Sequence, residues 1–170
     1  AASLVKPFVD SYDYKPTNYL AADETYTKVK GVRHYVWFVM DALKKSILGY
    51  QISNTRDVGP CILAMRMAFA KFKDFPGKAL KFISDGYTAY KLAQQQFSLQ
   101  DMDFNLIQVI GLTNDDPTST EYRWLKQIIE RLNRTFKFSY QVTNGYGSGE
   151  GSNTHVALFV AYYNFLRPHS

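Results

Sequence analysis

Hydrophobic residues in the first third of the chain follow a strand-like pattern. Three stretches are rich in Val, Ile and aromatic residues: residues 19–29, 34–42 and 47–53. Short polar segments that contain Lys30-Gly31 and Lys44-Lys45-Ser46 separate them, and such segments are typical of tight turns. Three strands joined so closely predict an antiparallel meander.

Helical spacing then alternates with short apolar runs. Asp57 can cap the first predicted helix, in which Pro60 is tolerated in the first turn and apolar residues recur at the period of an α-helix. Further helices are predicted over residues 88–97, about 119–138 and 153–165, and further strands over residues 79–84 and 104–110. The glycine-rich residues 144–151 predict a mobile loop between the last two helices.

This order of elements predicts one α/β domain. Right-handed crossovers would place the fourth and fifth strands parallel to the first, which gives a five-stranded mixed sheet of order 3-2-1-4-5 flanked by helices. We expect residues 19–170 to form the domain, because a chain of 170 residues supports a single core. Residues 1–18 lack clear periodicity and are interpreted as an N-terminal lead-in segment.

Two aspartates fall where the predicted strand order reverses, between the first and fourth strands. Asp23 lies inside the first strand, and Asp85 ends the fourth. Open α/β sheets bind ligands at such a switch point. Neighbouring buried carboxylates repel each other, and a divalent cation relieves the repulsion, so oxygen ligands here predict Mg²⁺ or Mn²⁺.

Glu130 is the third candidate, midway along the long predicted helix. It lies in a basic stripe with Lys126, Arg134 and Lys137. The alternative is a solvated helix face with ion pairs between Lys126, Glu130 and Arg134. The opposite face should pack on the sheet; it carries Trp124, Leu125, Ile128, Ile129, Leu132 and Phe136.

Other acidic residues have simpler interpretations. Asp41 follows an apolar strand, and a turn role is expected for it, with a metal contact as the less favoured alternative. Glu24 should point to the face opposite Asp23, with a salt bridge as its default role. Glu121 competes with Glu130, but it has capping-box spacing from Thr118 and so has a structural explanation. His34, His155 and His169 lack the spacing of a zinc site.

Four segments together resemble the catalytic domain of DDE-type insertion-sequence transposases and retroviral-type integrases. They are residues 23–31 (Asp-Glu-Thr-Tyr-Thr-Lys-Val-Lys-Gly), 84–87 (Ser-Asp-Gly-Tyr), 129–137 (Ile-Glu-Arg-Leu-Asn-Arg-Thr-Phe-Lys) and 163–169 (Tyr-Asn-Phe-Leu-Arg-Pro-His). The first two acids are 85 − 23 = 62 positions apart and the last two 130 − 85 = 45, a longer spacing that suggests an insertion around residues 111–118.

The resemblance implies an RNase H-like fold in which Asp23, Asp85 and Glu130 hold two Mg²⁺ or Mn²⁺ ions. It implies cleavage of DNA at the ends of a mobile element and joining of the freed 3′-hydroxyl to target DNA by two-metal phosphoryl transfer. Two alternatives remain open at this point. One is a catalytically silent, domesticated DNA-binding module, and the other is an RNase H-like nuclease.

Charge and composition agree with a DNA partner. The net charge is +5 and the sequence pI is about 9.2, and Lys126, Arg134 and Lys137 are the candidates for phosphate contacts. The lone Cys61 excludes an internal disulfide, and the apolar runs are too short to span a bilayer, so a cytoplasmic protein is expected. A homo-oligomer in the active complex is expected, with recognition of the element ends outside these residues.

Overall fold

The computed structural model of the chain describes residues 2–109, 117–142 and 149–166. One five-stranded sheet of order β3-β2-β1-β4-β5 forms its centre. β1 (Tyr19–Val29), β2 (Val32–Asp41) and β3 (Ser46–Ser53) form the antiparallel meander. β4 (Lys81–Ser84) and β5 (Asn105–Gln108) run parallel to β1. The predicted fold class, strand order and strand directions are confirmed.

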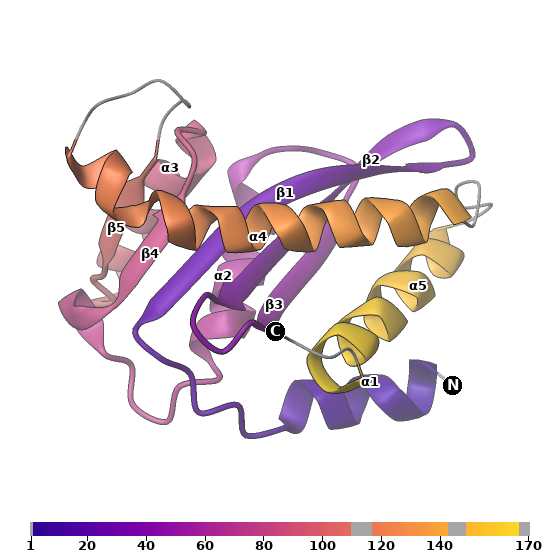
Figure 1. Cartoon of the computed structure of the whole chain (residues 1–170), viewed down its shortest axis with the longest axis horizontal. Helices are drawn as coiled ribbons and strands as arrows, with labels where there is room; N and C mark the ends of the chain where they lie inside the picture. Colours follow the sequence, from indigo (N-terminus) through magenta and orange to yellow (C-terminus); the bar gives the residue numbers. More distant parts are fainter. Residues whose placement is uncertain (1, 110–116, 143–148, 167–170) are drawn as a thin grey trace.

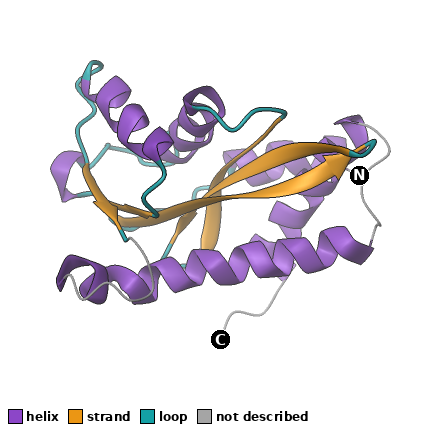
Figure 2. Cartoon of the chain, turned by 90° about the horizontal axis from the view of Figure 1, so that it is seen from above, coloured by secondary structure: helices purple, strands orange, loops and turns teal. Residues whose placement is uncertain are grey.

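Helices cover both faces of this sheet (Figures 1 and 2). α4 (Pro117–Val142) crosses one face, where α5 (Gly149–Ala161) and the N-terminal α1 (Ala2–Ser11) share its hydrophobic core. α2 (Val58–Phe69) and α3 (Thr88–Ser98) cover the other face. A 3₁₀ turn (Gly77–Ala79) precedes β4, and a π-helical turn (Tyr162–Leu166) follows α5.

Each face of the sheet has its own aromatic core, because successive side chains of a strand point to opposite faces. Phe38 packs edge-on against Phe136 of α4, while its neighbour Trp37 packs edge-on against Tyr90 of α3. Leu20 and Ala21 of β1 likewise enter different cores, and both are fully buried. β1 is therefore a central strand, and a charged side chain on it needs a specific partner.

Three expectations about local structure need revision. The lead-in segment 1–18 contains a regular helix, α1, which packs on α5 and buries Val9. Trp124, expected on the buried face of α4, is 54% exposed. The predicted loop 144–151 ends early, because α5 already begins at Gly149; the remainder lies outside the described residues, as does most of the suggested insertion. The division at residue 18 stays a prediction.

The Asn-Phe-Leu-Arg-Pro-His tail begins with a structural residue. The side chain of Asn164 accepts a hydrogen bond from Ile47 N at 2.7 Å and donates to Ile47 O at 3.0 Å, which ties the tail to the start of β3. It also donates to the Tyr14 hydroxyl at 3.1 Å. Arg167 and His169 lie outside the described residues. None of the described helices combines the length and apolar character needed to cross a membrane.

Candidate metal centre

Two aspartates from neighbouring strands meet where the strand order reverses. The parallel pairing of β1 with β4 ends at Ala21 opposite Ile83. Asp23 lies two residues further along β1, and Asp85 lies two residues after Ile83, directly beyond the end of β4. Because the register is continuous, both carboxylates reach the same edge of the sheet. Carboxylate oxygens of Asp23, Glu24 and Asp85 all lie within 4.8 Å of one another.

Asp85 sits in a tight turn that fixes its side chain. Its Oδ1 accepts a hydrogen bond from Tyr87 N at 3.0 Å, the Asx-turn contact that Asp readily makes. Gln108 of β5 donates its Nε2 to the Asp85 backbone carbonyl at 3.0 Å. The end of β4 is therefore held on both sides, and among the described residues the second carboxylate oxygen of Asp85 has no hydrogen-bond partner and is available to a ligand.

Glu24 joins this group from the opposite face of β1. Its Oε2 accepts a hydrogen bond from the Tyr90 hydroxyl at 2.9 Å, and its Oε1 accepts from Arg56, through Nε at 3.0 Å and also through a terminal nitrogen. The salt bridge expected for Glu24 is thus confirmed. Both carboxylate oxygens of Glu24 already accept hydrogen bonds from protein groups, whereas a metal ligand needs an oxygen that is available to the ion.

Asp23 has the most perturbed carboxyl group of the site. Burial raises its pKa to about 7, and the charges of Glu24 and Asp85 add to that rise; the Glu24 backbone N–H and Lys126 oppose it. Asn133 of α4 donates Nδ2 to Asp23 Oδ2 at 3.0 Å. The amide oxygen of Asn133 is buried and has no hydrogen-bond partner among the described residues.

Glu130 lies on the same helix, one turn before Asn133, and pairs with a lysine. Lys126 Nζ lies 2.8 Å from Glu130 Oε1, with side-chain exposures of 14% for Lys126 and 44% for Glu130. Burial lowers the pKa of Lys126, but its hydrogen bond to Glu130 and the charges of Glu130, Asp23 and Asp85 raise it overall. The Lys126 ammonium therefore interacts with all three predicted acids. Among the described residues, Glu130 is not part of the close carboxylate group.

The remaining sequence candidates have distinct surroundings. Asp41 is fully buried, and its carboxylate accepts hydrogen bonds from Thr17 N and Oγ1 and from the backbone of Leu43 and Lys44, so the expected turn role is confirmed. Arg134 lines a shallow hollow on α4 together with Glu130. The side chain of Glu121 lies outside what the structure describes.

Sequence reasoning missed Asn133 and the position of Lys126. Asn133 lies next to the basic residue Arg134 in the sequence and was not among the candidates, yet it is 8% exposed and donates a hydrogen bond to Asp23. The signal was available in the spacing, since residues 126, 130 and 133 lie on one stripe of a helix. Glu130, the candidate third ligand, lies on this stripe too. The apolar residues of α4 alone therefore did not show which of its polar residues face β1.

The donor set fits a hard divalent cation. All the available atoms are carboxylate oxygens, which Mg²⁺ and Mn²⁺ prefer. Crowded anions and burial penalise ionised Asp23, and a bound cation would remove that penalty. Within this acidic group, Glu24 is ion-paired with Arg56, whereas Asp23 and Asp85 form no ion pair with another described residue.

Comparison with known proteins agrees with this geometry. Residues 18–169 match the family model of the IS240 transposase "DDE domain". No curated protein sequence matches the chain. Similar solved structures include the HTLV-2 integrase catalytic core domain in complex with magnesium, at a TM-score of 0.62 and 12% identity, with 94% of each chain covered. The BIV integrase catalytic core domain matches at a TM-score of 0.53 and 12% identity, covering 90% of this chain and 87% of that one.

A larger assembly is also similar. The match to a chain of the simian T-cell lymphotropic virus intasome, solved in complex with PP2A regulatory subunit B56 gamma, has a TM-score of 0.64 and 16% identity, and covers 91% of this chain. It covers 51% of that chain, so the present sequence spans about half of its length. At these identities the likeness shows the fold, and the predicted RNase H-like architecture is confirmed.

Proposed function

Because the chain belongs to the DDE transposase domain family, we propose that it is a catalytic core that cuts DNA at the ends of a mobile element and joins the freed 3′-hydroxyl to target DNA. The observation that carries this proposal is the Asp23–Asp85 pair at the switch point of the sheet. Neighbouring strands hold these two carboxylates together, and the raised pKa of Asp23 shows that its ionised form is disfavoured, so a divalent cation would stabilise the site.

We propose Asp23, Asp85 and Glu130 as the metal ligands. Glu130 reaches the pair by exchanging its contact with Lys126 for the metal, and its half-exposed side chain leaves it free to turn. Glu24 keeps Arg56 and Tyr90 as partners and acts as a fixed charge beside the ligands. Two bound Mg²⁺ or Mn²⁺ ions would activate the attacking oxygen and stabilise the leaving oxygen at phosphorus.

Protein side chains then orient the reacting strands. Asn133 holds Asp23 by its hydrogen bond, so one carboxylate oxygen has a fixed direction. Lys126, freed from Glu130, is placed to contact a phosphate beside the ligands, and Arg134 and Lys137 extend the basic stripe along α4. We place the enzyme with its DNA in the cytoplasm, active as a homo-oligomer, with the element ends read by residues outside this domain.

The decisive experiment incubates the protein with Mn²⁺ and labelled DNA that carries the ends of its element. We expect strand-transfer products, in which label becomes joined to target DNA. Cleavage without joining would instead identify an RNase H-like nuclease. Binding with neither reaction, under conditions in which the metal is shown to bind, would identify a silent DNA-binding module.

The identity of the third ligand has its own prediction. Glu130→Gln should lower strand transfer on the order of 100-fold, because the charge that holds the metal is lost. The matched variant Glu24→Gln should retain activity within about tenfold, since its amide oxygen still accepts a hydrogen bond. Initial rates at saturating Mn²⁺ give both values. The reverse order of the two effects would make Glu24 the third ligand and Glu130 only the partner of Lys126.

A further inference from the structure

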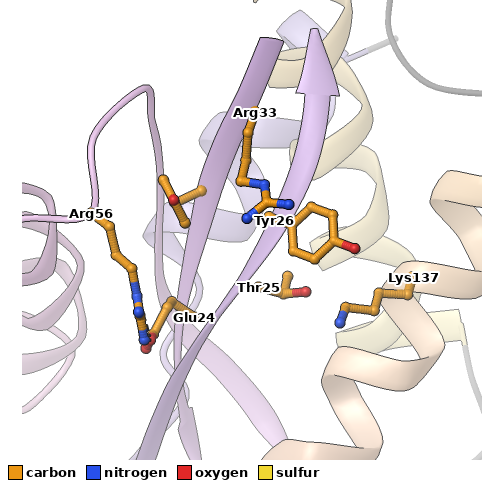
Figure 3. Close-up of a pocket in the computed structure, with 7 residues that line it drawn as sticks. Glu24, Thr25, Tyr26, Arg33, Arg56 and Lys137 are labelled. Carbon is orange, nitrogen blue, oxygen red and sulfur yellow. Dashed lines mark hydrogen bonds and ion pairs between the residues drawn. The ribbon is translucent and has the colours of Figure 1, made fainter. Parts of the chain in front are cut away.

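A hollow of about 210 Å³ opens beside the acidic group, along the edge of β1 (Figure 3). Its walls include Thr25 and Tyr26 of β1, Arg33 of β2, Arg56 before α2 and Lys137 of α4. We call it the β1-edge pocket. The pairing of β1 with β4 stops at Ala21, so among the described strands this part of β1 has a neighbour on its β2 side alone. Strand edges of this kind are open to a ligand.

The charge of the β1-edge pocket is positive. Its lining holds three cations and one carboxylate, a balance of 3 − 1 = +2. The carboxylate, Glu24, is paired with Arg56. Arg33 and Lys137 have no ion-pair partner among the described residues, and both lie over the ring of Tyr26, at 4.5 and 5.1 Å from its centroid. The ring of Tyr26 thus positions two cations that have no ion-pair partner among the described residues at the same pocket.

A buried hydroxyl in the same pocket lacks a partner. Thr25 is 5% exposed, and its Oγ1 has no hydrogen-bond partner among the described residues. In Figure 3 this hydroxyl lies on the side of β1 from which Lys137 approaches. A buried hydroxyl without a hydrogen bond is costly, and an anionic oxygen in the pocket would accept its proton. The Thr25 hydroxyl and the two cations therefore both favour a ligand with anionic oxygens.

We propose that the β1-edge pocket binds a phosphodiester of the DNA strand, next to the phosphodiester that reacts. This inference rests on the proposed function, because the acids of the metal centre define where the reacting phosphate lies. Thr25 follows Asp23 by two residues, a rise of about 7 Å along a strand. A strand that presents one phosphate to Asp23 thus presents a neighbouring one to Thr25, Arg33 and Lys137. The pocket would fix the direction of the strand and the position of the bond to be cut.

DNA binding in EDTA tests the pocket separately from catalysis. The probe is a fluorescein-labelled duplex with a single-stranded 3′ extension, followed by anisotropy over a range of salt concentrations. Arg33→Gln and Lys137→Gln should each weaken binding about 3–10-fold, and each should reduce the slope of log affinity against log salt by about 0.7–0.9. The control is Lys91→Gln, which removes one positive charge at an exposed position of α3 and should change neither value.

Thr25→Val distinguishes a ligand contact from a purely structural role. It should weaken DNA binding while leaving the melting temperature unchanged or raised, because it removes a hydroxyl that has no partner in the free protein. Equal binding by wild type, Thr25→Val, Arg33→Gln and Lys137→Gln would overturn the pocket while leaving strand transfer, and hence the proposed function, intact. Absence of both DNA binding and strand transfer would overturn the two proposals together.

Discussion

Asp85→Asn should abolish both cleavage and joining while DNA binding and folding survive. The amide cannot hold a divalent cation as a carboxylate does, and the metal contributes several kcal/mol to stabilising charge at phosphorus. Since about 1.4 kcal/mol corresponds to tenfold in rate, we expect a loss on the order of 1,000-fold or more. Single-turnover assays in Mn²⁺ on nicked and intact element ends measure the two steps separately.

The fold should tolerate this substitution because the turn keeps its acceptor. The amide oxygen of Asn accepts the hydrogen bond from Tyr87 N as the carboxylate does. Asp101→Asn is the matched control: Asp101 is exposed, its backbone φ is 59°, and Asn is also at ease in that left-handed region. Asp101→Asn should leave both reactions unchanged. Activity retained by Asp85→Asn would refute the assignment of the metal centre.

The arrangement of the sheet could be predicted because its signals are local and periodic. β1 has the bounds expected from its composition, and two closely following strands admit few alternatives to a meander. The right-handed crossover then places β4 beside β1, which brings Asp23 and Asp85 together without any knowledge of side-chain packing. The aspartate pair could therefore be predicted from connection rules and strand alternation.

The helical side of the site could not be predicted in the same way. Its geometry depends on how α4 is rotated over the sheet, and a stripe of polar residues beside apolar ones leaves that rotation open by about one residue, or 100°. Asn133 is buried and Trp124 exposed because α4 turns this stripe toward Asp23. The helix α1 was not predicted for a similar reason, since its position depends on its packing against α5, which is far away in the sequence.

The metal-free protein should lose stability as the pH rises from about 4 to about 7, because of Asp23. Burial and the neighbouring acids raise its folded pKa to about 7 from a usual value of 3.8. The folded state therefore binds a proton more tightly than the unfolded state in that range, so stability falls with rising pH and levels off above pH 7. This rise of the Asp23 pKa corresponds to a loss of roughly 4 kcal/mol at most in the free energy of unfolding.

Urea unfolding in EDTA across this range measures the effect, and Asp23→Asn supplies the comparison. The amide cannot ionise and still accepts the hydrogen bond from Asn133, so the variant should show a flatter profile and exceed the wild type in stability near pH 7. Excess Mn²⁺ should remove the decline in the wild type, because the cation stabilises the ionised folded site and competes with the proton. Mn²⁺ should leave the pH profile of the stability of Asp23→Asn unchanged. If the stability of the wild type instead rose steadily with pH in EDTA, Asp23 would ionise easily in the folded protein. Repulsion among the crowded carboxylates would then not explain why this edge of the sheet binds metal.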